Sequence, residues 1–215
     1  MKKYTYWHEI YEDIDIFEKY TEYRYKKHID DKKEYFRYVG NIGLDSEIKH
    51  SLNFDKIHFF EGYFRQDIVD GFFDDNMMGV SKIDRNVPCF FQIINYLNLT
   101  EDTQIRFNAQ PPSQMIGNHT DGYKSFFDSV LGADITPDSY KNVRWERKYE
   151  IDEIKRYIIF LDDWTEGQVF MTGKDAIVDW KAGDVFSFEW YIPHSTANAS
   201  TKTRNLLVVT GIENN

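Results

Sequence analysis

The chain has 215 residues, which suffices for one domain with a sizeable hydrophobic core and is short for two. A hydrophobic fraction of 41% and an aromatic fraction of 17% exclude a disordered chain. The formal net charge of -10 argues against a nucleic-acid partner, because an acidic surface repels the phosphate backbone.

The cysteine content and the apolar runs indicate the compartment. Cys89 is the single cysteine, which excludes an intramolecular disulfide and any CxxC motif. The N-terminal residues contain no apolar run of signal-peptide length, and no stretch is long enough to span a membrane. We therefore expect a cytoplasmic protein without a membrane partner.

The first part of the chain, residues 1–102, is expected to be a mainly helical extension packed on a core. Apolar residues recur at helical spacing in the first 40 residues, in residues 67–78 and again after Pro88. The residues expected to contact the outer face of the core are Phe72, Phe73, Phe91 and Ile94.

From residue 103 the pattern changes to short β-type runs separated by turn residues. The predicted strands are 105–110, 115–121, 156–162, 168–172, 176–180, 185–190, 194–198 and 206–210. Such a series is typical of a jelly roll or a related sandwich. Residues 122–155 interrupt it and are too long for a plain turn, so they are expected to form a lid or substrate loop. Residues 103–215, with this insert, are the predicted catalytic core.

Two His-X-Asp triplets are candidates for metal binding. Residues 28–30 lie in the helical region, where positions i and i+2 point to different sides, and we interpret them as surface charge. Residues 119–121 end a predicted strand, where positions i and i+2 share a face and can reach one metal ion. On this triplet alone an alternative stays open, in which Asp121 begins a turn and His119 is an ordinary half-buried residue.

Two later residues favour the metal-site interpretation. His194 begins a predicted strand, and Arg204 follows ten residues later at the entry to the last strand. Two histidines and one carboxylate leave three coordination positions open, as in the facial triad of iron(II) oxygenases. An arginine in the same pocket can hold a dicarboxylate with its fork of donors.

This order of residues resembles the 2-oxoglutarate- and Fe(II)-dependent dioxygenase superfamily, whose motif is HxD, a distal His and then Arg or Lys. The resemblance covers residues 103–212. Residues 180–188, followed by Pro193, His194 and Asn198, also resemble aspartyl/asparaginyl β-hydroxylases and uncharacterised phage oxygenases. If a phage encodes the chain, the expected cytoplasm is that of the host cell. The fold that the resemblance implies is mainly β, a double-stranded β-helix (jelly-roll or cupin-like) with flanking N-terminal helices.

The resemblance also implies a hydroxylase mechanism. His119, Asp121 and His194 would bind Fe(II), and 2-oxoglutarate would chelate the iron while Arg204 binds its far carboxylate. Reaction with O2 would give succinate and CO2 and hydroxylate the substrate, with the chemistry supplied by the metal and the cosubstrate.

The residues beyond this motif are less specific. Leu206 stands where one common variant of the superfamily carries a serine, so another donor must assist Arg204. Arg156 and Asn108 are candidates for binding the cosubstrate, although each also fits an ordinary strand position. The candidate substrate-binding residues directly follow the HxD and equally fit packing of the insert: Tyr123, Lys124 and Phe126.

The expected substrate is a protein or peptide side chain. A free small molecule such as an amino acid is the alternative, because a long loop can serve either an open groove or a closing lid. A third possibility is a non-redox, cupin-like metal-binding protein. Arg204 disfavours it, since such a protein needs no carboxylate clamp.

Overall fold

The computed structural model describes residues 14–31, 33–44, 79–83, 85–87, 89–120 and 154–214. The elements in chain order are α2 (Ile14–Asp30), β1 (Arg37–Asn41), β2 (Gly79–Ile83), α5 (Cys89–Tyr96), β3 (Leu99–Gln110), β4 (Gln114–His119), β5 (Ile154–Phe160), β6 (Gln168–Thr172), β7 (Ala176–Ile177), β8 (Asp184–Ser187), β9 (His194–Asn198) and β10 (Arg204–Glu213).

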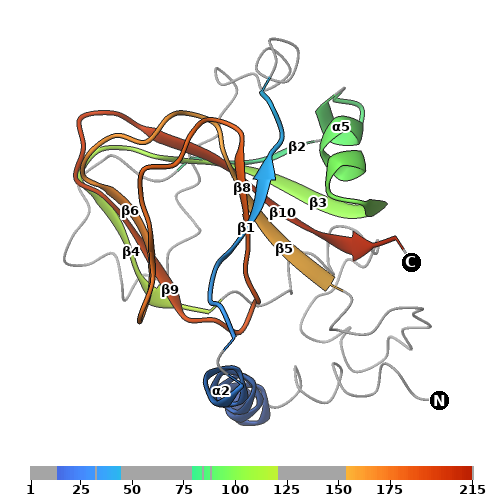
Figure 1. Cartoon of the computed structure of the whole chain (residues 1–215), viewed down its shortest axis with the longest axis vertical. Coiled ribbons are helices and arrows are strands. Elements are labelled where there is room, and N and C mark those ends of the chain that lie inside the picture. The colour runs from blue at the N-terminus through green and yellow to red at the C-terminus, as the bar shows by residue number, and fades with distance from the viewer. Residues whose placement is uncertain are drawn as a thin grey trace.

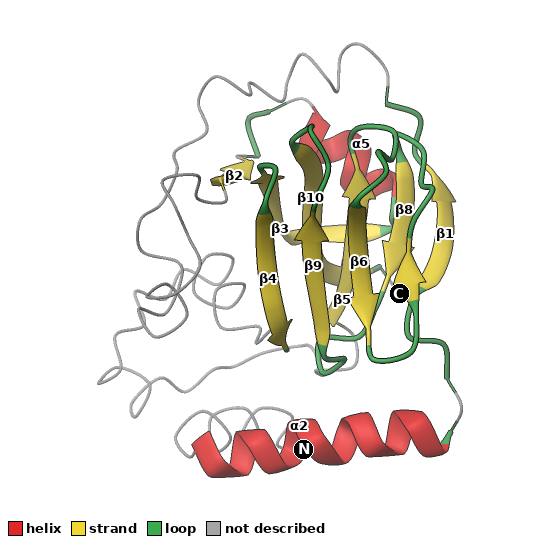
Figure 2. Ribbon diagram, turned by 90° about the vertical axis from the view of Figure 1, so that its left-hand side faces the viewer, coloured by secondary structure: helices red, strands yellow, loops and turns green. Residues whose placement is uncertain are grey.

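The strands form two antiparallel sheets that face each other (Figure 2). The six-stranded sheet has the order β1-β8-β5-β10-β3-β2, and the four-stranded sheet has the order β4-β9-β6-β7. Each β-type run predicted from the sequence corresponds to one of these strands, and β6 and β9 have the predicted bounds. The prediction of a mainly β, jelly-roll or cupin-like fold is confirmed.

The core between the sheets is strongly aromatic. Alternate residues of β5 and β10 point into it, so Ile158, Phe160 and Leu206 are all buried there. The Phe160 ring stacks on Trp180 with centroids 3.9 Å apart and planes 12° apart. The Trp180 indole also donates to the Asp162 carbonyl at 3.1 Å, and this tryptophan is a buried core residue.

The outer face of the six-stranded sheet is covered by α5 (Figure 1). This helix confirms the helix predicted after Pro88, and its Ile94 is buried as expected. The prediction for Phe91 is wrong, because that side chain is 43% exposed on the opposite side of the helix. Phe72 and Phe73 lie outside the described residues. Within the described part of the chain, no helix combines the length and hydrophobicity that crossing a membrane requires.

The N-terminal region also supplies strands, which differs from the mainly helical extension expected for residues 1–102. β1 pairs with β8 and β2 pairs with β3, so both complete the edges of the six-stranded sheet. β1 was missed because a register shift between Tyr38 and Gly40 leaves it without alternating burial. The boundary predicted at residue 103 falls inside β3, which begins at Leu99.

Helix α2 lies across one end of the sandwich (Figure 2) and is anchored by His28. The interpretation of His28 as surface charge is wrong, because its side chain is only 3% exposed. Its Nε2 donates to the Glu34 carbonyl at 3.0 Å, which leaves Nδ1 to accept from the Tyr191 hydroxyl at 3.3 Å. A long-range aromatic contact of this kind leaves no local pattern in the sequence.

The docking of α2 is predicted to weaken in acid. Burial lowers the pKa of His28 below its usual value, so the undocked helix binds a proton more readily than the docked one. Docking is therefore fully stable above a pH of about 6.5, the ordinary histidine pKa, and weakens as the pH falls below it. Hydrogen exchange of α2 amides, corrected for intrinsic rates, should increase between pH 7.5 and pH 5.5.

His28→Ala provides the comparison for this prediction. It should lower the free energy of opening of α2 by about 1–3 kcal/mol at both pH values, because the Tyr191 hydroxyl loses a buried partner. Exchange of the α2 amides should therefore be faster at both pH values. It should also remove the difference between the two pH values. A pH effect that persists in the variant would show that another group titrates.

Candidate active site

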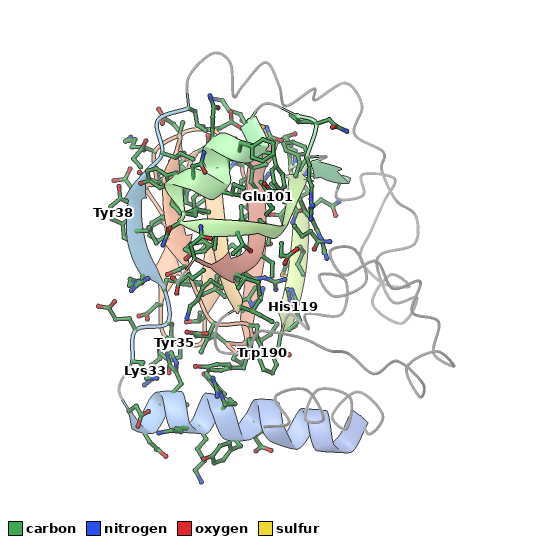
Figure 3. The ribbon with its side chains drawn as sticks, turned by 90° about the vertical axis from the view of Figure 1, so that its right-hand side faces the viewer. Lys33, Tyr35, Tyr38, Glu101, His119 and Trp190 are labelled. Carbon is green, nitrogen blue, oxygen red and sulfur yellow. The ribbon has the colours of Figure 1, made fainter. Side chains whose placement is uncertain are left out.

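Two histidines meet at one end of the four-stranded sheet. Figure 3 shows that His119 lies at the end next to α2. His119 ends β4 and His194 begins β9, and the two residues are direct partners in the antiparallel register. Their ring centroids are 4.4 Å apart. Residues 75 positions apart in the chain are thus brought side by side, as the sequence analysis predicted for His119 and His194.

Local backbone structure fixes how each ring is oriented. A register shift between Ile116 and His119 places the Gly117 carbonyl 2.8 Å from the His119 Nδ1. The turn before Pro193 places the Ile192 carbonyl 3.0 Å from the His194 Nδ1. Because a carbonyl can only accept, each Nδ1 carries the hydrogen and each Nε2 holds the lone pair. Metal-binding histidines commonly have this arrangement.

The third predicted ligand, Asp121, lies outside the described residues. So do the substrate candidates Tyr123, Lys124 and Phe126, and the insert except for its last two residues, which already belong to β5. Within the described part of the chain, no group of three His, Cys, Asp or Glu side chains is placed to hold a metal. The structure therefore describes two of the three predicted ligands, the histidines, and Asp121 remains a prediction.

Arg204 is a buried cation in the interior. It is 3% exposed, and its guanidinium donates to the Val169 carbonyl at 3.0 Å. The Nε of Arg204 has no hydrogen-bond partner among the described residues. Burial lowers the pKa of Arg204 to about 9, which reflects the cost of keeping this charge away from water. A buried cation with an unused donor is suited to an anionic ligand.

Phe170 separates Arg204 from the histidine pair. Its ring stacks on His194 with centroids 5.4 Å apart and planes 9° apart. The guanidinium carbon of Arg204 lies 5.9 Å from the centroid of the same ring. Phe188 also packs on His194, at a centroid distance of 5.0 Å. One apolar wall thus runs from the candidate metal ligand to the buried cation.

Asn108 and Arg156 both belong to the six-stranded sheet, on the face that carries Arg204. Asn108 is half-buried, pairs with Leu206 in the register, and its Oδ1 has no partner among the described residues. Arg156 is buried, and its Nε donates to Thr210 Oγ1 at 3.2 Å.

The position of Arg156 disfavours it as the second donor to an anion at Arg204. Thr210, its partner across the strands, is six residues along β10 from Arg204, which is about 20 Å of extended strand. Asn108 is the nearer of the two candidates, because its partner Leu206 is two residues from Arg204.

Two residues near Arg204, Gln110 and Thr196, were not predicted from the sequence. Gln110 is the direct register partner of Arg204, and its Nε2 donates to Thr196 Oγ1 at 3.1 Å. Asn198 donates to the Gln110 carbonyl at 2.7 Å and accepts from Ser200 Oγ at 2.6 Å, which fixes the turn before β10. The available signal for Thr196 was its position two residues after His194, on the same face of the strand.

Comparison with known proteins identifies the family. The sequence model of the aspartyl/asparaginyl beta-hydroxylase family matches residues 78–213, well over half of the chain. The chain belongs to this family. The resemblance read from the sequence is therefore confirmed, and family membership supports hydroxylase activity. No protein with curated annotation matches the chain.

Three solved structures are similar to this chain at low sequence identity. A prolyl-4-hydroxylase from Pseudomonas putida is 13% identical, with 86% of this chain and 96% of that chain covered and a TM-score of 0.47. A collagen prolyl hydroxylase of Paramecium bursaria Chlorella virus-1, a 2-oxoglutarate complex, is 10% identical over 83% and 97%, with a TM-score of 0.45. A cupin barrel protein from Salinispora arenicola is 10% identical over 69% and 87%, with a TM-score of 0.35.

Proposed function

We propose that this member of the family is an Fe(II)- and 2-oxoglutarate-dependent oxygenase that hydroxylates a side chain of a protein or peptide. The observation that carries the proposal is the single interior wall that joins a pair of oriented histidines to a buried arginine. A metal-binding module would use the histidines alone, whereas a dicarboxylate cosubstrate accounts for Arg204 as well.

The described residues fit the metal. The Nδ1 atoms of His119 and His194 point to backbone carbonyls, so the Nε2 of each ring is the nitrogen that would bind the metal. Asp121, two residues after His119, would supply the carboxylate of a facial triad. The set of two imidazoles and one carboxylate suits Fe(II) and leaves positions open for a cosubstrate and O2.

The described residues also fit the cosubstrate. The Arg204 guanidinium has an unused donor in the interior, and a carboxylate there would supply the missing negative charge. Asn108 is the nearer of the two further candidates, because its register partner Leu206 is two residues from Arg204. Phe170 and Phe188 form an apolar wall beside His194, which keeps water away from the reacting atoms.

When bound, Fe(II) and 2-oxoglutarate supply the oxidation, in which O2 is consumed and succinate and CO2 are released. The chain's own residues bind and orient. The carbonyls of Gly117 and Ile192 hold the two imidazole rings at fixed angles, and Arg204 neutralises the far carboxylate of the cosubstrate. These residues thus contribute positioning and charge compensation.

The substrate class is supported by the family description, which names aspartyl and asparaginyl residues. Helix α2 lies at the same end of the sandwich as His119 (Figure 3). A free amino acid remains the second candidate for the substrate. We also propose that residues 122–155 act at the entrance to the active site. The cytoplasmic location and the absence of a nucleic-acid partner also remain predictions.

The test is succinate formation from 2-oxoglutarate by the full chain loaded with Fe(II). We expect slow uncoupled turnover that accelerates with peptides containing Asp or Asn and yields a product 16 Da heavier by mass spectrometry. Acceleration by free amino acids alone would support the small-molecule alternative. No succinate with any peptide or amino-acid pool, in protein shown to bind iron, would refute the proposed activity.

A further inference from the structure

The interior beside Arg204 contains more hydrogen-bonding capacity than the described residues use. The Nε of Arg204 and the Oε1 of Gln110 are buried without a partner among the described residues. Thr196 is 3% exposed and accepts a hydrogen bond from Gln110. Unused buried polar groups are costly, so a cluster of them indicates a ligand that completes it.

The orientation of the Gln110 amide is fixed by its surroundings. Its nitrogen lies 3.1 Å from the Gln114 carbonyl and 3.1 Å from Thr196 Oγ1. Reversing the amide would place its oxygen against the Gln114 carbonyl oxygen, which repels it. Gln110 is therefore the donor in its bond to Thr196.

This orientation determines what the Thr196 hydroxyl can do. A hydroxyl has one hydrogen to donate, and the Gln110 amide already occupies an acceptor site on its oxygen. Thr196 donates its own hydrogen to no described residue. The hydroxyl hydrogen is therefore available to an acceptor in the interior, and the strongest such acceptor is a carboxylate.

Thr196 stands in the right place to meet a ligand of Arg204. It is two residues after His194 on β9, so the two side chains share a face of the strand. Its partner in β6 is Phe170, the residue that contacts both Arg204 and His194. Its hydrogen-bond partner Gln110 is the direct register neighbour of Arg204.

We propose that the Thr196 hydroxyl is the second donor to the far carboxylate of 2-oxoglutarate. This inference rests on the proposed function. Leu206 on β10 has no hydroxyl group, so the second donor comes from β9 instead. Gln110 is a positioning residue that orients the Thr196 hydroxyl. Arg204 and Thr196 then bind the same carboxylate from the two facing sheets.

The test compares two ligands in Thr196→Val and Thr196→Ser. Affinities for 2-oxoglutarate and for 2-oxopentanoate are measured by calorimetry on Mn(II)-loaded protein, which reports binding without turnover. The second ligand keeps the keto acid and the chain length but lacks the far carboxylate. We expect Thr196→Val to weaken 2-oxoglutarate binding roughly 10- to 100-fold and Thr196→Ser to retain most of it, because a hydrogen bond to a charged group is lost only in the first.

Binding of 2-oxopentanoate should change less than twofold in either variant. Equal weakening of both ligands by Thr196→Val would overturn the inference, since it would indicate a packing role. An unchanged 2-oxoglutarate affinity in Thr196→Val would overturn the inference too. In that case, a loss of 2-oxoglutarate affinity in Arg204→Ala would still support the proposed function. Thr103→Val is the matched control, because that buried hydroxyl donates to the Thr100 carbonyl, away from the site.

Discussion

His194→Asn is expected to abolish iron binding and hydroxylation while the chain stays folded. Asparagine retains a side-chain nitrogen that can donate to the Ile192 carbonyl, but it lacks the Nε2 lone pair. Removing residues that only support a ligand costs about 10- to 100-fold in metal affinity, so removing the ligand itself should cost more. Iron affinity is measured by anaerobic titration, and folding by the thermal unfolding transition.

His28→Asn is the matched control for that experiment. His28 is as buried as His194, and its partner is Tyr191 rather than a metal. We expect this variant to loosen α2 and to bind iron with an affinity close to that of the parent. Tight iron binding by His194→Asn would contradict the proposed metal site, and loss of iron in both variants would point to a general structural defect.

Arg204→Ala is expected to weaken 2-oxoglutarate binding by about 2–5 kcal/mol, roughly 30-fold to several thousand-fold, because a buried carboxylate loses its charged partner. Arg204→Lys should restore binding only in part, since lysine offers a point charge in place of a planar fork. Iron binding should survive in both variants. The measurement is a 2-oxoglutarate titration of the iron-loaded proteins without O2.

Arg156→Ala separates the role of Arg204 from that of interior charge in general. Arg156 is similarly buried but donates to Thr210, far along β10 from Arg204. Its removal should affect 2-oxoglutarate much less than the removal of Arg204. A larger effect for Arg156→Ala, with Arg204→Ala near the parent, would move the carboxylate clamp to the other end of the sheet.

The sequence allowed the strands and the paired histidines to be predicted because both depend on local periodicity. A strand places alternate residues on one face, so the predicted run that ends with residues 119–121 and the run that begins at His194 already indicated which side chains share a face. Antiparallel pairing of β4 with β9 then brings them together. Arg204 was predicted from its spacing instead, ten residues after His194 at the entry to the last predicted strand.

Other parts depend on contacts between distant residues and were not predictable from local pattern. The burial of His28 requires Tyr191, which is 163 positions away. β1 is recognisable only through its pairing with β8, because its own residues show no alternation. Likewise, the role inferred for Thr196 depends on the orientation of the Gln110 amide, which the Gln114 backbone determines.

The burial of Cys89, the first residue of α5, has a practical consequence. Its side chain is fully buried, and burial raises the pKa of the thiol to about 11, so it reacts slowly with maleimides and nitroxide reagents in the folded protein. As Cys89 is the single cysteine, a new cysteine at the exposed position Lys26 would be labelled selectively without prior removal of any residue. Spin-label spectra recorded from that position would report directly on how firmly α2 is held at the mouth of the sandwich.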